Sequence, residues 1–307
     1  MLLAHRSGLD SFPHQFGWDT EAAFSPQYRP AAPAQMQAMS HEEFLIASLT
    51  PDGLNYNARA WIHEPNQKYH YSVSAYPFLR YLIGQVTEQS YADHMHENIF
   101  TPLEMTNSGF SADEFVGRHA IPYTRIDGKN IEISVWNGQG SMMHTTAEDM
   151  AKFLAAFMND GQYGGVQVLQ PQTIELMQQR TSRLKVLFKK SDDLPRRGHG
   201  LGLFALRGGW FGNGGSAPGF QCLSRFNSSR QVGYVILSNV NAILSGSDNY
   251  ASARHDIYIV QDALVSILDP ALAIRSRTGE IGVVGALIVY FLTVGLWRRR
   301  RKARLQQ

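Results

Sequence analysis

Apolar and polar positions divide the chain into a mainly helical part followed by a part with strand periodicity. Residues 1–70 lack helical periodicity, and we expect loops there with one short helix near 41–49. Apolar residues then recur at helical spacing, and three helices carry start signals: Ser90 as an N-cap, Thr145–Asp149 as a source of an N-cap and first-turn acids, and Pro171 at a first helical position. The predicted helices are 76–88, 90–100, 146–158 and 171–180.

From Gly200 onward the apolar period changes to two, which is typical of strands. The predicted strands are Gly202–Leu206, Trp210–Asn213, Gln221–Asn227 and Val232–Ser238. A hairpin turn at 227–230 predicts antiparallel pairing, and a helix over about 251–268 should cover the sheet. The pattern predicts an α/β (α+β) fold, in which helices flank an antiparallel sheet beside a mostly helical subdomain around 76–160, with mixed loop and short strand at 110–145.

The C-terminus carries a different signal, because residues 281–297 are 17 consecutive residues without a charge. That length is at the short end of what spans a bilayer. A buried C-terminal helix is the alternative, but four arginines follow directly and favour a membrane helix with a cytoplasmic tail at 298–307. The body, residues 1–275, should then be periplasmic or extracellular. Residues 1–8 contain no apolar run long enough for an export signal, so the chain either begins inside a longer gene product or inserts its tail unusually.

Composition excludes several classes of protein. A hydrophobic fraction of 44% and a charged fraction of 18% are those of a globular protein. Six of the 28 basic residues lie in the last ten positions, and the remaining chain carries 22 basic against 26 acidic residues, so no nucleic-acid footprint is expected. Cys222 is the single cysteine, which excludes an intrachain disulfide and favours a buried structural thiol. His94 and His96 would diverge on a helix, so no metal site is expected.

Four sequence segments resemble one family. They are Leu2–Leu9 (LLAHRSGL), Tyr69–Tyr76 (YHYSVSAY) with Pro102–Met105 (PLEM), Gly140–Met150 (GSMMHTTAEDM) and Phe211–Phe220 (FGNGGSAPGF). In this order they resemble the serine β-lactamase and penicillin-binding-protein-like superfamily, especially its class C and esterase-like members. The resemblance implies a β-lactamase/transpeptidase-like fold over residues 1–268 and hydrolysis of acyl, amide or ester bonds without a cofactor.

The resemblance also implies a site. Tyr71 stands at the tyrosine of the family's Y-x-N motif, a general base, while Val73 replaces the asparagine. Asn213 stands at the histidine of the H-x-G strand. Gly214 and Gly215 are retained there, and the N–H of Ser216 would be an oxyanion donor. A small acyl or peptide ligand is the expected partner.

The family's nucleophile lies in an S-x-x-K helix before the stretch that begins here at Leu2, so we expect an N-terminally truncated domain that does not catalyse on its own. The string at Ser182–Lys185 lies after the predicted helix 171–180, downstream of Tyr71 and not upstream of it, and is interpreted as accidental. Two hypotheses remain open. The chain is a membrane-anchored serine hydrolase of this family in which Tyr71 is a vestigial base, or it is a catalytically dead, membrane-tethered module that binds a ligand or a protein partner.

Overall fold

The structure is a computed structural model of the chain. It describes residues 1–10, 46–47, 49–53, 56, 61–72, 75–126, 129–132, 143–183, 196–217, 219–241, 257–265, 267–268 and 289–293.

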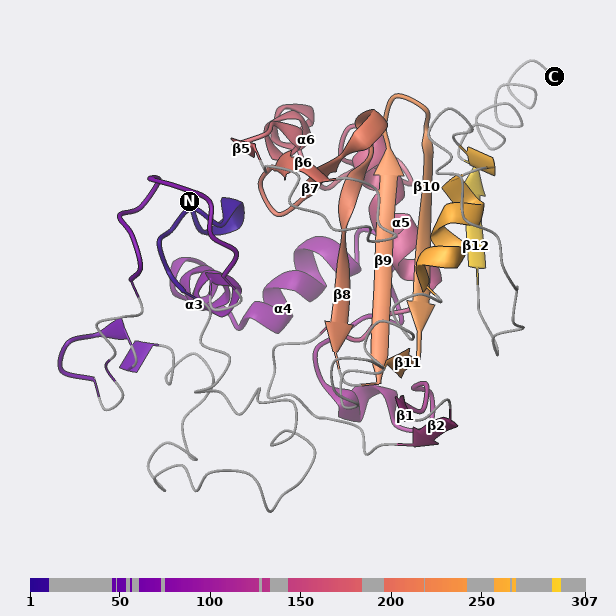
Figure 1. Ribbon diagram of the computed structural model, residues 1–307, viewed down its shortest axis with the longest axis horizontal. Coiled ribbons are helices and arrows are strands. Elements are labelled where there is room, and N and C mark those ends of the chain that lie inside the picture. Colours follow the sequence, from indigo (N-terminus) through magenta and orange to yellow (C-terminus); the bar gives the residue numbers. More distant parts are fainter. Residues whose placement is uncertain are drawn as a thin grey trace.

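Within the described residues, seven strands form one sheet in the order β12-β10-β9-β8-β7-β6-β5, and every neighbouring pair is antiparallel (Figure 1). The strands are β5 (Ser182–Arg183), β6 (Arg196–His199), β7 (Phe204–Leu206), β8 (Phe211–Ala217), β9 (Phe220–Asn227), β10 (Val232–Ser238) and β12 (Val289–Thr293). Strands β9 and β10 lie inside the sheet and pair with each other from Val232↔Asn227 to Ser238↔Gln221. The predicted antiparallel sheet is confirmed, and its hairpin turn is closed by an Asn227 Oδ1 that accepts the N–H of Arg230.

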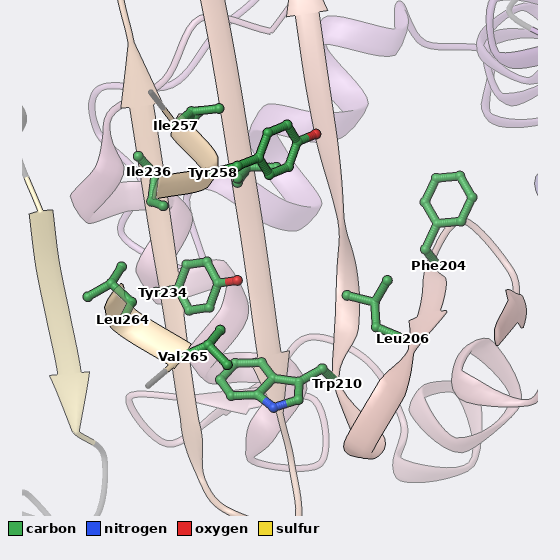
Figure 2. Close-up of a cluster of buried hydrophobic side chains, with 10 residues drawn as sticks. Phe204, Leu206, Trp210, Tyr234, Ile236, Ile257, Tyr258, Leu264 and Val265 are labelled. Atoms are coloured by element: carbon green, nitrogen blue, oxygen red, sulfur yellow. The ribbon is translucent and has the colours of Figure 1, made fainter. Parts of the chain in front are cut away.

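Helices cover both faces of this sheet (Figure 1). On one face α5 (Ala147–Met158) packs through Leu154 and Phe157 against Phe226 and Val235 of β9 and β10. On the opposite face, residues 257–265 and 267–268 are helical, as predicted. Side chains of this segment and of the sheet form one buried cluster (Figure 2). The cluster consists of Phe204, Leu206, Trp210, Leu223, Tyr234, Ile236, Ile257, Tyr258, Leu264 and Val265. The period-two alternation of β9 and β10 thus supplies one core on each face.

The remaining helices begin at or next to the residues that the sequence signals indicate. They are α3 (Ala75–Thr87), α4 (Tyr91–Met95), the π-helical turn η4 (His96–Phe100) and α6 (Pro171–Gln178), with short 3-10 helices η1 (Leu2–Ala4), η5 (Ala112–Phe115) and η6 (Arg207–Gly209). Ser90 Oγ accepts the N–H of Asp93 at 3.1 Å, and Thr146 Oγ1 accepts that of Asp149 at 3.2 Å. The predicted N-cap Ser90 is therefore confirmed, and within the stretch Thr145–Asp149 the N-cap is Thr146.

The region around 76–160 is less helical than predicted. A hairpin of β1 (Tyr123–Ile126) and β2 (Lys129–Glu132) lies at one end of the sheet, and β1 pairs in parallel with β11 (Val240–Asn241) (Figure 1). A second small hairpin joins β3 (Gln162–Tyr163) to β4 (Val166–Gln167). All four residues of β2 are exposed. Such strands carry no apolar stripe, so hydrophobic periodicity cannot reveal them.

The C-terminal segment differs most from expectation. Five residues of the predicted membrane helix 281–297 form β12, which pairs antiparallel with β10 from Val232↔Thr293 to Ile236↔Val289. A single helix over 281–297 is wrong at these five positions, because the sequence Val-Tyr-Phe-Leu-Thr has strong strand preference and an uncharged apolar run fits either structure. The rest of 281–297 lies outside the described residues. Among the described residues, no helix has the length and apolar character needed to cross a membrane.

Candidate functional site

The segment that carries Tyr71 is held by the first ten residues of the chain. Backbone N–H groups of Ile62, Asn66 and His70 donate to the carbonyls of residues 8, 6 and 5, at 2.9, 2.7 and 2.8 Å. Side chains add to this ladder, since His70 Nε2 lies 2.8 Å from a carboxylate oxygen of Asp10. Tyr71 itself remains 52% exposed. The backbone around it is therefore fixed, while the side chain stays accessible to a ligand.

Two buried imidazoles lie beneath Tyr71. The His5 side chain is 2% exposed and that of His199, at the end of β6, is 1% exposed. Their ring centroids are 4.8 Å apart, and the His5 ring lies 4.4 Å from that of Tyr71. Tyr76, from the first turn of α3, lies 5.3 Å from His5, and Tyr69 lies 5.9 Å from it. The cluster joins three parts of the chain: the N-terminal segment, the Tyr71 segment and the sheet.

Burial sets the charge of these groups. Desolvation, with smaller effects from His199 and His70, lowers the pKa of His5 to about 3, so this imidazole is neutral at pH 7. Its Nδ1 accepts the backbone N–H of Ser72 at 3.2 Å, which places the proton of the neutral ring on Nε2. Desolvation also raises the pKa of Tyr76 to about 12, with Tyr71 and Tyr69 contributing. Tyr76 is therefore an un-ionised phenol at physiological pH.

The glycine-rich strand β8 forms the second half of the site. The side-chain amide of Asn213 donates to the Gly202 carbonyl at 2.5 Å. The Asn213 carbonyl accepts from the guanidinium of Arg225, which is 1% exposed, and from Ser224 Oγ at 3.3 Å. Asn213 is thus fixed through both its side chain and its backbone. At Gly212, φ is 145° and a Cβ would lie 2.0 Å from the Ser224 carbonyl oxygen, so only glycine fits this close approach.

Beyond Gly212 the strand β8 continues past its neighbour. Strand β7 pairs with Phe211 and Gly212, whereas β9 pairs with β8 as far as Ala217. Gly214, Gly215 and Ser216 are exposed. Asn241 Nδ2 donates to Ser216 Oγ at 2.8 Å, which fixes that hydroxyl. These residues present an accessible strand edge of the kind that binds extended peptides or acyl groups.

Gly202 connects the two halves. Its N–H donates to the Leu3 carbonyl at 2.9 Å, and its own carbonyl accepts from Asn213. The neighbouring His199 has Nδ1 2.7 Å from the Gly200 carbonyl, so this nitrogen carries the proton. Arg6 adds a further tie, since its Nη1 donates to the Thr181 carbonyl at 3.0 Å. The structure therefore places Tyr71 and Asn213 on one hydrogen-bonded frame.

Other candidate residues lie outside this frame or have structural roles. Ser182 is in β5, paired with His199 and 7% exposed, so it is not on a helix that could hold Lys185 on the same face. Lys185 and Val73 lie outside the described residues. The described part of the chain contains no group of three or more His, Cys, Asp or Glu side chains that could hold a metal ion. His94 Nδ1 lies instead 3.3 Å from Asn98 Nδ2. Cys222 is partly buried, and desolvation raises the pKa of its thiol.

Sequence reasoning missed His5, His199 and Arg225. His5 lies inside the quoted stretch LLAHRSGL, so a motif pointed to its segment without indicating that the ring is buried beneath Tyr71. Arg225 interrupts the apolar alternation of β9. A charged residue in the middle of a buried strand is itself a signal for a functional or structural polar contact.

An antiparallel sheet between two layers of helix, with a tyrosine segment tied to a glycine-rich strand, is the arrangement of β-lactamase-like and penicillin-binding-protein-like hydrolases. The family model described as Beta-lactamase matches residues 1–255. The chain therefore belongs to the beta-lactamase family.

Similar proteins extend this assignment. Protein flp of Staphylococcus aureus (strain NCTC 8325 / PS 47) is 25% identical over 195 residues, which are 59% of this chain and 35% of that protein. The chain thus spans about a third of the length of this curated relative. The octameric penicillin-binding protein homologue from Pyrococcus abyssi superposes with a TM-score of 0.64 at 18% identity, covering 86% of this chain and 55% of that one. D-amino acid amidase from Ochrobactrum anthropi SV3, complexed with L-phenylalanine amide, gives 0.58 at 22% identity, covering 87% and 71%.

Proposed function

We propose that this chain carries the acyl-ligand pocket of a membrane-anchored serine hydrolase of the beta-lactamase family, and that its 307 residues do not form an acyl-enzyme by themselves. The supporting observation is the hydrogen-bonded frame that holds an exposed Tyr71 and a fixed Asn213 together. The ligand would be a small amide, ester or peptide, whose acyl group lies along the exposed edge of β8 at Gly214–Ser216.

The absence of acylation follows from the position of Ser182. It begins the one Ser-x-x-Lys string in the sequence, and its strand conformation does not support the helical arrangement that activates a serine through lysine. Asn213 also supplies a neutral amide where the H-x-G strand has an imidazole. Tyr71 therefore serves as a ligand contact in this chain and not as a base.

Labelling with a fluorescent penicillin and with a fluorophosphonate tests this proposal. We expect no covalent adduct on the purified full chain, with Ser182→Ala as the matched control. Intact-mass detection of an acylated or phosphonylated residue would refute the inactive assignment, and loss of that adduct in Ser182→Ala would identify the string at 182–185 as the nucleophile.

Reversible binding is tested separately by titration with L-phenylalanine amide, the molecule bound in the similar amidase structure. We expect binding that is weakened by Asn213→Ala and by Tyr71→Ala but not by Tyr81→Ala, a tyrosine elsewhere on α3. Equal affinity in all variants would place the ligand outside this frame.

We infer membrane attachment from the uncharged run at 281–297 and the arginines at 298–301, and this attachment requires residues 289–293 to leave their pairing with β10 in the membrane-bound chain. Carbonate-resistant association with vesicles, and protection of the body from added protease in sealed inside-out vesicles, are the expected results. A body that is digested in inside-out vesicles but protected in right-side-out ones would reverse the topology.

The alternative is a membrane-tethered module that binds a protein partner. It is favoured by the replacement of two family positions, at Val73 and Asn213, while Gly214 and Gly215 are retained. Absence of amide binding, together with capture of an extended peptide along β8, would support this alternative.

A further inference from the structure

A pair of buried histidines lies where the two halves of the site meet. The His5 and His199 rings contact each other in an edge-on arrangement, with 68° between their planes. His5 comes from the N-terminal segment and His199 from the end of β6, 194 positions apart in the sequence. Buried, polar and uncharged groups are kept in a protein only where hydrogen bonds satisfy them. Both rings have such hydrogen-bond partners.

His5 acts on the Tyr71 half through both its backbone and its ring. Its carbonyl accepts the N–H of His70, and its Nδ1 accepts the N–H of Ser72. The two residues that flank Tyr71 are thus both bonded to His5. Ser72 is fully buried, and its hydroxyl donates to the Asp10 carbonyl at 3.1 Å. Moving His5 therefore displaces the backbone on both sides of Tyr71.

His199 acts on the Asn213 half. Its carbonyl accepts from both the N–H and the hydroxyl of Thr181, and its Nδ1 donates to the Gly200 carbonyl. The chain then turns through Gly200, whose N–H donates to the Leu203 carbonyl, and this turn presents the Gly202 carbonyl to Asn213. The direction of the Asn213 amide therefore depends on the placement of His199.

The Tyr71 half and the Asn213 half of the site respond together because the His5 and His199 rings pack directly against each other. His5 is faced by His199, by the Tyr69, Tyr71 and Tyr76 rings, and by the nearby His70; His199 is faced by His5, Tyr69 and Phe204. No apolar side chain of the same shape reproduces the acceptor at His5 Nδ1 or the donor at His199 Nδ1.

On the proposed function above, we propose that His5 and His199 are positioning residues that set the relative placement of Tyr71 and Asn213, and thereby the affinity for an acyl or amide ligand. Neither ring touches the ligand. They act through Ser72 and through the turn at 200–202.

Two substitutions of His5 distinguish the effect of its hydrogen bond to Ser72 from the effect of its side-chain volume. In His5→Asn, the side-chain Oδ1 replaces Nδ1 as acceptor for Ser72, whereas His5→Leu removes the acceptor and keeps most of the volume. Met105→Ala is the control for a general loss of stability, because Met105 is 2% exposed and lies in a separate core cluster with Phe100 and Leu103.

The readouts are the side-chain amide resonance of Asn213 in asparagine-labelled protein, assigned by its loss in Asn213→Ala, and the affinity for L-phenylalanine amide. We expect His5→Leu to shift the Asn213 resonance and to weaken binding about tenfold, the factor that corresponds to one ordinary hydrogen bond. His5→Asn should retain both properties, and Met105→Ala should lower the melting temperature without shifting the resonance. If the role of His5 were merely structural, His5→Leu and Met105→Ala would change the resonance and the affinity alike, and that result would overturn the proposal.

Two further outcomes distinguish failure of the proposed function from failure of the positioning role of His5. If wild-type chain does not bind the amide but the Asn213 resonance still responds to His5→Leu and not to Met105→Ala, the proposed function fails and the positioning role stands. If His5→Leu does not fold, the nitrogen resonances of His5 in the unmodified chain decide. An unprotonated Nδ1 and a protonated Nε2 at pH 7 support the role, and the opposite tautomer or a charged ring overturns it.

Discussion

The buried His5 predicts that the chain loses stability in mild acid. Its pKa is about 3 in the folded protein and 6.5 for an ordinary histidine, so between these values the unfolded chain binds one more proton than the folded chain. Because the unfolded state gains the proton, the free energy of unfolding falls as pH decreases below 6.5, by about 1.4 kcal/mol for each pH unit. Between pH 6.5 and 4.5 the loss is about 3 kcal/mol, a large part of the 5–15 kcal/mol, roughly, that stabilises a typical domain.

A comparison of two chains isolates this contribution from all other titrating groups. Urea unfolding of wild type and His5→Asn at pH 7.0 and at pH 4.5 gives four free energies of unfolding. We expect the wild type to lose about 3 kcal/mol more than His5→Asn over this interval, because asparagine cannot take up a proton. The matched control is His96→Asn, at an exposed histidine of η4, which should follow the wild type. Equal pH dependence in wild type and His5→Asn would show that His5 is accessible to protons in the folded chain, and would refute the reasoning.

Three further substitutions test the packing around the site. Asp149→Ala removes a 1%-exposed carboxylate that accepts from the Asn107 N–H and the Ser108 hydroxyl, and should cost about 2–4 kcal/mol in urea unfolding, whereas the exposed Asp113→Ala should cost under about 1 kcal/mol. Trp210→Ala empties a fully buried position and should cost about 3–5 kcal/mol; a loss below about 1 kcal/mol would contradict the packing in Figure 2. Gly212→Ala should destabilise more than Gly117→Ala in thermal melts, because both have positive φ but only the first places a Cβ against backbone, and equal losses would refute the close approach.

Sequence reasoning located the elements whose signals are local. Ser90, Thr146 and Pro171 begin their helices as expected, because capping hydrogen bonds and the fixed φ of proline depend on a few neighbouring residues. The alternation of β9 and β10 was recognisable because each strand is buried on both faces by different cores. Strand β8 continues four residues beyond its predicted end, since Gly214–Ser216 have no apolar pattern. Strand β6 was missed for the same reason, whereas β2 lies in the stretch 110–145 where short strand was expected without bounds.

The site was predictable in part. The motifs singled out Tyr71 and Asn213, and the structure connects their segments through hydrogen bonds, while the roles assigned to these residues stay predictions. The connection itself could not be derived, because it depends on tertiary contacts of His5, His199 and Gly202 that lie far apart in the sequence. The run at 281–297 was assigned from its length, its lack of charge and the arginines that follow it, and none of these distinguishes a helix from a strand such as β12 at 289–293.

Gly202 has a consequence for engineering the specificity of this pocket. Gly202 and Leu3 contribute only main-chain atoms to the hydrogen bonds that pass through this position, namely the N–H and carbonyl of Gly202 and the carbonyl of Leu3, and the remaining partner is the side-chain amide of Asn213. Side chains at positions 3 and 201 can therefore be randomised in a library without removing a bond from the frame, and Leu3 is already 38% accessible to solvent. Such a library would vary the side chains next to Gly202 while the main-chain bonds of the frame are kept.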